Sequence, residues 1–82
     1  MEREQIKYEL QLAGWWEDRF ENFHYLMNDR ETRVRFHKDH RITIEFRSRF
    51  KQWVIFGEAY DRYVRRHGKF LIIDDVEIKV RK

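Results

Sequence analysis

The chain has 82 residues, of which 41% are hydrophobic and 40% charged, with a formal net charge of +3 and neither cysteine nor proline. This length accommodates one domain with one core, and the 17% of aromatic residues excludes a disordered chain. The absence of cysteine excludes disulfides and thiolate metal sites and fits a reducing compartment, so we expect a cytoplasmic protein. No apolar run approaches the about 18 residues of a membrane-spanning helix, so we expect no membrane partner.

The two signs of charge are distributed unevenly along the chain. Residues 1–29 contain three basic and seven acidic side chains, whereas residues 30–82 contain 15 basic and eight acidic ones. The net charges are therefore −4 and +7. We expect a single domain over residues 1–82 with an acidic part at 1–29 and a basic, strand-rich part at 30–82.

Residues 2–28 have the periodicity of one long amphipathic helix. Their apolar positions step by three or four residues, as in a helix. These positions are Ile6, Leu10, Ala13, Trp16, Phe20, Phe23 and Met27. Gly14 costs about 1 kcal/mol relative to alanine inside a helix, which allows a kink or break at that point. Asn28 and Asp29 favour turns, so the predicted acidic helix ends there.

From Thr32 the periodicity changes from 3.6 to two, which is typical of β-strands. Apolar residues alternate with charged ones around residues 32–37 and again over 41–47. The pattern predicts two strands joined by a short polar turn. Residues 50–56 are rich in aromatic and β-branched side chains, and they predict a third strand that is apolar on both faces.

Helical spacing returns in the predicted short helix at about 58–67, which Gly68 would terminate. Residues 70–73 then predict a buried strand, and Asp74 and Asp75 a turn. A last half-buried strand begins at Val76. The predicted fold is α+β, in the order α-β-β-β-α-β-β, with a mostly antiparallel sheet packed against the long N-terminal helix.

Catalytic and metal-binding motifs are nearly absent. Ser48 is the only serine, and it lacks the G-x-S-x-G context that exposes a nucleophile. His37 and His40 are close in sequence with Asp39 between them, but a structural zinc site needs four ligands and no second cluster exists. We therefore expect a protein that is not an enzyme and has no cofactor and no metal.

The strongest functional signal is the outward face of the predicted sheet. If the alternating apolar residues form the core, the intervening arginines share the other face with an aromatic residue of the third strand. Arginine binds phosphate and stacks on bases, so this combination is typical of surfaces for single-stranded RNA or DNA. The predicted nucleic-acid-binding residues are Arg33, Arg35, Arg41, Arg47, Arg49, Lys51 and Trp53. In the alternative interpretation, a helix covers this face and the arginines only reach its edges.

The acidic helix supports a second hypothesis from a different class. An exposed Trp15 beside Glu17, Asp18 and Glu21 would let the chain bind a basic partner protein as a regulator or inhibitor of the phage or mobile-element type. The alternative is that these acidic residues are merely solvated. Trp15 and Trp16 together exceed the apolar area that the helix needs, which favours a homodimer that buries one of them.

Overall fold

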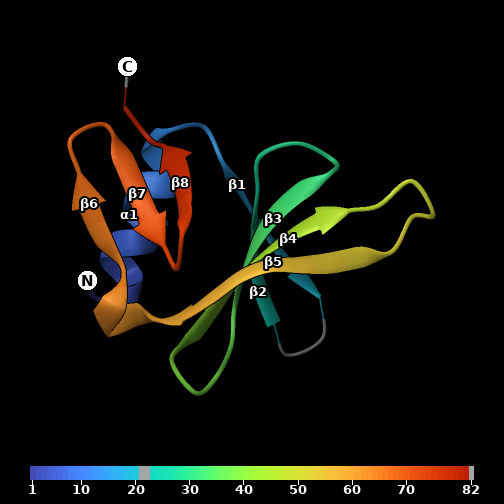
Figure 1. The fold of residues 1–82 in the computed structure, drawn as a ribbon, viewed down its shortest axis with the longest axis horizontal. Helices are drawn as coiled ribbons and strands as arrows, with labels where there is room; N and C mark the ends of the chain where they lie inside the picture. Colours follow the sequence, from blue (N-terminus) through green and yellow to red (C-terminus); the bar gives the residue numbers. More distant parts are fainter. Residues whose placement is uncertain (21–22, 82) are drawn as a thin grey trace.

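The computed structural model describes residues 1–20 and 23–81, and the side chains of these residues except 20 and 23–25. Within these ranges the chain forms one α-helix, α1 (Arg3–Leu12), a short 3-10 helix, η1 (Asp61–Tyr63), and eight strands (Figure 1). The strands are β1 (Trp16–Phe20), β2 (Phe23–Met27), β3 (Thr32–Phe36), β4 (Arg41–Arg47), β5 (Trp53–Tyr60), β6 (Arg65–His67), β7 (Phe70–Ile73) and β8 (Val76–Lys79).

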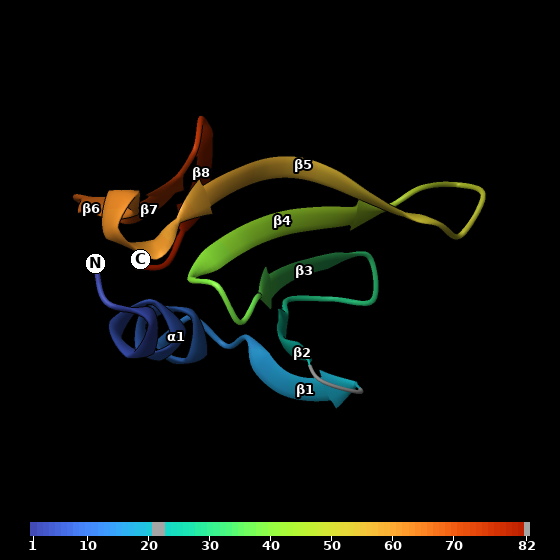
Figure 2. The same cartoon turned by 90° about the horizontal axis from the view of Figure 1, so that it is seen from below.

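The strands form two antiparallel sheets. The first contains β1 to β5 in chain order, each strand paired with its neighbour in sequence, and the second contains β6, β7 and β8. Strand β5 runs out of the first sheet towards η1 and the second sheet, while its hairpin with β4 projects at the opposite end (Figure 2). The class α+β is confirmed at this coarse level, but the domain is predominantly β.

One core connects the helix with both sheets. The buried residues come from one side of α1, from the inner face of β2, β3 and β4, and from the second sheet with its flanking residues, and α1 lies beneath the second sheet in Figure 2. The core residues are Ile6, Leu10, Trp15, Leu26, Val34, Phe36, Ile42, Ile44, Val64, Leu71, Ile73 and Val80. Because a chain of this size has little interior, each of these positions contributes a large share of the stability.

The long helix predicted for residues 2–28 is wrong, because α1 ends at Leu12. The Gly14 N–H donates to the Gln11 carbonyl over 3.0 Å and the Trp15 N–H donates to the Leu10 carbonyl over 3.0 Å. With Gly14 at a φ of 98°, this is a Schellman motif, which glycine accommodates without strain. Residues 16–20 and 23–27 pair as β1 and β2 instead, and the side chains of Phe20 and Phe23 lie outside the described residues.

The predicted helix at 58–67 is also wrong. Residues 58–60 continue β5, and after η1 the chain pairs as β6 with β7. Gly68, expected to end a helix, has a φ of 61° in the β6–β7 turn, where left-handed backbone is equally required. The strands predicted at 41–47 and 70–73 are confirmed, and Asp74 and Asp75 form the turn between β7 and β8.

A buried carboxylate joins α1 to the second sheet. Glu9 is only 4% exposed, and its Oε1 accepts hydrogen bonds of 3.0 Å from Arg66 and from Arg81. The bond from Arg81, together with that from Arg66, lowers the pKa of Glu9 below its ordinary value, although burial acts in the opposite direction. Arg66 and Arg81 are separated from Glu9 by 57 and 72 positions in sequence, so these hydrogen bonds attach distant parts of the chain to one turn of α1.

We expect Glu9→Gln to lower the free energy of unfolding by about 1–3 kcal/mol, because a neutral amide replaces the acceptor of charge-assisted hydrogen bonds. Arg66 and Arg81 are partly exposed and can rehydrate, which keeps the loss below that of a fully buried pair. Denaturant unfolding at neutral pH measures the change. The matched control is Glu4→Gln, an exposed position on the same helix, which should change stability by less than about 0.5 kcal/mol.

The same pair of proteins gives a pH test. A carboxyl whose pKa is lowered by folding contributes stability above its unfolded-state pKa, about 4.3, and loses this contribution as the pH falls through the folded value. The difference in the free energy of unfolding between the wild type and Glu9→Gln should therefore be largest at neutral pH. It should shrink as the pH falls below the unfolded-state pKa of about 4.3. A difference that is constant with pH would contradict the role of the Glu9 charge.

Candidate nucleic-acid interface

The outward face of β3 and β4 carries a closed polar network. Buried Glu45 accepts a hydrogen bond of 2.7 Å from Arg33 Nε and one of 3.0 Å from the Thr43 hydroxyl. Thr43 Oγ1 also lies 3.0 Å from His37 Nε2. The alternation of β3 and β4 places these side chains on one face, opposite the apolar core. The network links cross-strand neighbours, since Arg33 is the register partner of Glu45.

This network uses the charge of two predicted nucleic-acid-binding residues. Arg33 Nη2 lies 2.7 Å and Arg35 Nη1 3.8 Å from the Glu45 carboxylate. Arg41 lies at the other end of β4, where it pairs with Asp39 at 2.9 Å and with Glu58 at 3.2 Å. The sequence correctly places Arg33 and Arg35 on the face of the sheet opposite the core. However, Arg33, Arg35 and Arg41 are all bound to carboxylates within the fold.

The surroundings of His37 disfavour its protonated form. Burial lowers the pKa of His37, and the positive charges of Arg35 and Arg41 lower it further. His40 points elsewhere, with its Nδ1 2.9 Å from Asp61 Oδ2. Among the described residues, no three His, Asp or Glu side chains lie together as a metal site would require.

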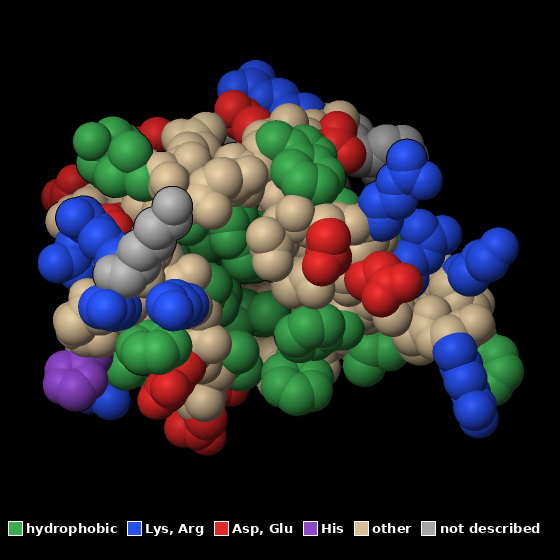
Figure 3. Space-filling model, turned by 90° about the horizontal axis from the view of Figure 1, so that it is seen from above, with side chains coloured by type: hydrophobic (Ala, Val, Ile, Leu, Met, Phe, Trp, Pro, Cys, Tyr) green, Lys and Arg blue, Asp and Glu red, His purple; other side chains and the backbone are tan. Residues whose placement is uncertain are grey.

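The remaining predicted residues lie at the tip of the β4–β5 hairpin. Arg47 is the last residue of β4, and Arg49 and Lys51 lie in the turn that follows it. Within the described part of the chain none of these three residues forms an ion pair. Arg30 of the β2–β3 turn joins them along a shallow cleft of about 370 Å³, which Glu31 also lines. Figure 3 shows Lys and Arg side chains gathered at the end of the molecule from which this hairpin projects.

Two aromatic side chains accompany these cations. Phe50 at the turn is 73% exposed, and the Arg49 guanidinium lies 5.1 Å from its ring centroid. Trp53 is half-buried between Arg33, whose guanidinium lies 4.0 Å from its ring, and Arg47 at 5.9 Å. The hairpin tip, defined here as residues 47–53, thus has three positive charges, no acidic residue and two flat rings.

Ser48 shapes this tip. Its Oγ accepts the Phe50 N–H at 3.2 Å and the Gln52 N–H at 3.3 Å, while the Lys51 N–H donates to the Ser48 carbonyl at 2.9 Å. Lys51 has a φ of 62°, which the turn requires. The backbone N–H of Arg47 donates to the Glu31 carbonyl at 2.7 Å and so attaches the tip to the β2–β3 turn. The serine hydroxyl is therefore occupied in the turn, and the cationic side chains project from an ordered backbone.

The residues of the protein-binding hypothesis are separated by the fold. Trp15 is only 6% exposed and belongs to the core, so its predicted exposure is wrong. Glu17 and Asp18 are exposed on the edge strand β1 rather than on a helix, and Glu21 lies outside the described residues. The exposed tryptophan is Trp16, which is 48% exposed at the start of β1.

A larger cleft, of about 530 Å³, lies where β5 meets the second sheet. It is lined by two arginines, two acidic residues and two tyrosines among others. Because Arg41 and Arg65 are balanced by Glu58 and Asp74, this cleft has no excess of either charge. The hairpin tip, in contrast, carries only positive charges.

Comparison with protein-family models, with curated proteins and with solved structures yields no match. No helix in the described part of the chain is long and apolar enough to cross a membrane.

Thr43→Val tests the polar network of β3 and β4. Valine removes the hydroxyl that bonds Glu45 and contacts His37, and it leaves their buried polar atoms without that partner. We expect the free energy of unfolding to fall by about 1–3 kcal/mol. The control is Thr32→Val on β3, a half-buried threonine, which should alter stability by less than about 0.5 kcal/mol. Equal effects of the two substitutions in denaturant unfolding would contradict the network.

Proposed function

We propose that the hairpin tip, residues 47–53, binds single-stranded RNA or DNA, and that the protein acts by binding rather than by catalysis. The observation that carries the proposal is the combination of unneutralised cations with an exposed aromatic ring. Arg47, Arg49 and Lys51 have no carboxylate partner among the described residues, whereas Arg33, Arg35 and Arg41 do. Counterions leave the nucleic acid when protein cations neutralise its phosphates, and only cations without a carboxylate partner are available for this, so the tip contributes most of the electrostatic affinity.

The two rings have different roles in this proposal. Phe50 is exposed and can stack on an unpaired base. Trp53 already stacks on Arg33 and thereby keeps a cationic, planar surface beside the tip. Every base has a stacking face, so this arrangement favours single strands without a strong preference for sequence.

Removing the charges of the tip tests the phosphate contacts. The triple change Arg47→Ala, Arg49→Ala and Lys51→Ala should weaken binding of a short labelled oligouridylate and reduce the slope of log affinity against log salt by about two. Fluorescence anisotropy over a salt series measures both quantities. The matched control removes three charges from the second sheet, at Arg65, Lys69 and Lys79, and should leave the slope nearly unchanged. Equal losses in the two triple variants would mean that overall charge, not the tip, governs binding.

Phe50→Ala tests stacking separately from charge. Because this ring is exposed, its removal should leave the melting temperature unchanged and weaken oligonucleotide binding by about 1–3 kcal/mol. Tyr8→Ala is the control, since Tyr8 is an exposed aromatic residue on α1, outside the tip. A wild type that binds neither oligouridylate nor oligothymidylate at low salt would overturn the proposal as a whole.

A second candidate function is binding to a basic partner protein through the edge strand β1, where Glu17 pairs with Arg19 at 3.0 Å and Asp18 adds a further negative charge. The specific observation in its favour is Trp16, which is exposed at the start of β1 beside Glu17 and Asp18. Because a large aromatic residue next to acidic ones is a typical interface anchor, Trp16→Ala should abolish such binding without affecting nucleic acid. The affinity for a protein partner should also depend weakly on salt, in contrast to oligonucleotide binding.

A further inference from the structure

Strand β5 is the last strand of the first sheet, and its outer edge is divided into two parts. The C-terminal part is covered by the β7–β8 turn, because the Glu58 N–H donates to Asp74 Oδ2 at 3.3 Å. Gly57 allows this contact, since a Cβ at this position would lie 3.0 Å from Val76 Cγ2. Among the described strands, none pairs with the outer edge at residues 53–56. Backbone donors and acceptors of that segment are therefore available to another strand.

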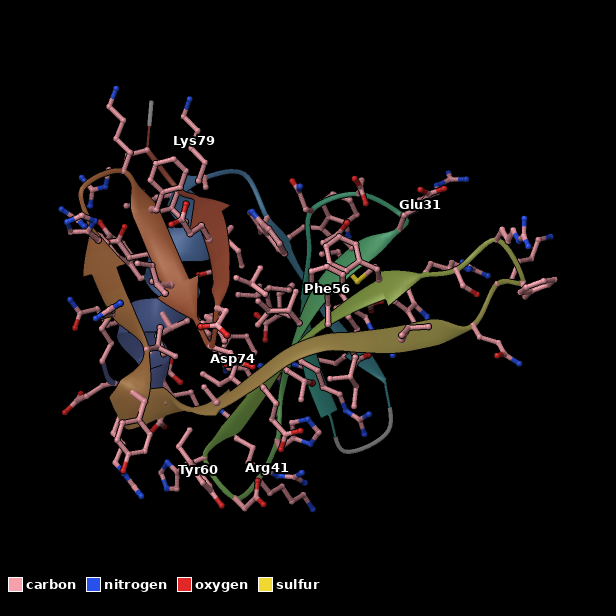
Figure 4. All side chains as sticks on the ribbon, viewed as in Figure 1. Glu31, Arg41, Phe56, Tyr60, Asp74 and Lys79 are labelled. Carbon is pink, nitrogen blue, oxygen red and sulfur yellow. The ribbon has the colours of Figure 1, made fainter. Side chains whose placement is uncertain are left out.

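The side chains of this open segment are apolar on both faces. Val54 is 51% exposed, Ile55 56% and Phe56 65%. Phe46 of β4 extends the apolar area, with its ring edge-on to Phe56 at 4.7 Å between centroids. Figure 4 shows Phe56 between Asp74 of the second sheet and the projecting end of the hairpin. Soluble proteins usually protect such an edge with charge, proline, a β-bulge or a covering segment. Residues 53–56 contain no charged residue and no proline, and the bulge that β5 forms opposite Ile44 and Glu45 lies at their C-terminal end.

The charges that flank the segment select the orientation of a partner strand. Arg49 and Lys51 precede it, while Glu58, which also pairs with Arg41 at 3.2 Å, follows it beside Asp74. A second copy in antiparallel orientation brings the basic end of one strand to the acidic end of the other. In parallel orientation, like charges would lie side by side. The segment is thus complementary to itself, as the interface of a two-fold dimer must be.

We infer that residues 53–56 of β5 pair with the same segment of a second copy, antiparallel, to form a symmetric homodimer. The first sheets of the two copies become continuous through main-chain hydrogen bonds, and Val54, Ile55 and Phe56 are buried against their counterparts. This dimer differs from the one predicted from the sequence, because Trp15 is in the core and is not available to an interface. It does not require nucleic-acid binding, because the pairing uses the backbone of residues 53–56; Trp53 belongs to both segments, and Arg49 and Lys51 of the tip contribute only to the orientation.

Sedimentation equilibrium tests the association. We expect the wild type to be dimeric in the micromolar range and Ile55→Lys to be monomeric, because a charge on each strand would face its copy across the edge. The matched control is Leu12→Lys on α1, which is also 56% exposed and should remain dimeric. Circular dichroism of both variants verifies that they fold. A wild type that is monomeric at high micromolar concentration, or a dimer that survives Ile55→Lys, overturns the inference; a peptide of another protein would then be the remaining occupant of the edge.

The orientation is tested by spin labelling, which the absence of native cysteine makes specific. With a label on Tyr60→Cys, the exposed last residue of β5, antiparallel pairing centred on residues 54 and 55 places the two labels roughly 35 Å apart, at about 3.4 Å per strand residue. Parallel pairing would bring them into close proximity. A broad or absent distance peak in Ile55→Lys, with a peak near the expected distance in the wild type, supports the dimer. A short distance in the wild type contradicts the antiparallel arrangement.

Discussion

The buried carboxylate of Glu45 is the interaction on which the charge distribution of the surface depends. It lies on a strand whose two faces are both covered, because Ile42 and Ile44 face the core while Thr43 and Glu45 face the polar network. A buried charge without a partner is very unfavourable, so Arg33 and the more distant Arg35 must stay beside it. The outward face of β3 and β4 is therefore an internal salt-bridge layer, although its residues in sequence have the pattern of an open basic surface.

Because the arginines beside Glu45 are neutralised, the hairpin tip differs from the rest of this face in its excess of positive charge. Beyond Glu45, β4 and β5 leave the body of the domain, and the chain from Arg47 to Trp53 contains no acidic residue. The cations there have no carboxylate partner among the described residues, and the Ser48 hydroxyl accepts two backbone N–H groups of the turn that carries them. Arg33 also connects the two regions, because the same guanidinium pairs with Glu45 and covers the ring of Trp53. The network around Glu45 thus supports Trp53 beside the proposed binding surface, and it also neutralises Arg33 and Arg35, which the sequence predicted as binding residues.

Several elements could be predicted because their information is local. Alternation of apolar and charged residues predicts β4, and two consecutive aspartates predict the β7–β8 turn. The errors arise where one local signal fits two structures. The apolar spacing before Asn28 suits a helix, but residues 16–20 and 23–27 pair as β1 and β2, and Gly14 in its left-handed conformation ends α1 before the pattern is complete. Gly68 likewise terminates a helix or forms a hairpin turn, and the pairing of β6 with β7 decides between them.

The sequence by itself determined one small domain of mixed class, without cysteine chemistry, with an acidic first part and a basic second part, and with its cations concentrated around the β4–β5 hairpin. Only the tertiary structure decided which of those cations remain available, because the pairing of Glu45 with Arg33 and of Glu9 with Arg66 and Arg81 depends on strand register and on contacts distant in sequence. The same holds for the edge of β5. Its apolar residues are typical of a core strand, and the position of the strand at the end of the sheet is what leaves Val54, Ile55 and Phe56 exposed. Burial and pairing are properties of the whole fold, and composition and periodicity report only on the local chain.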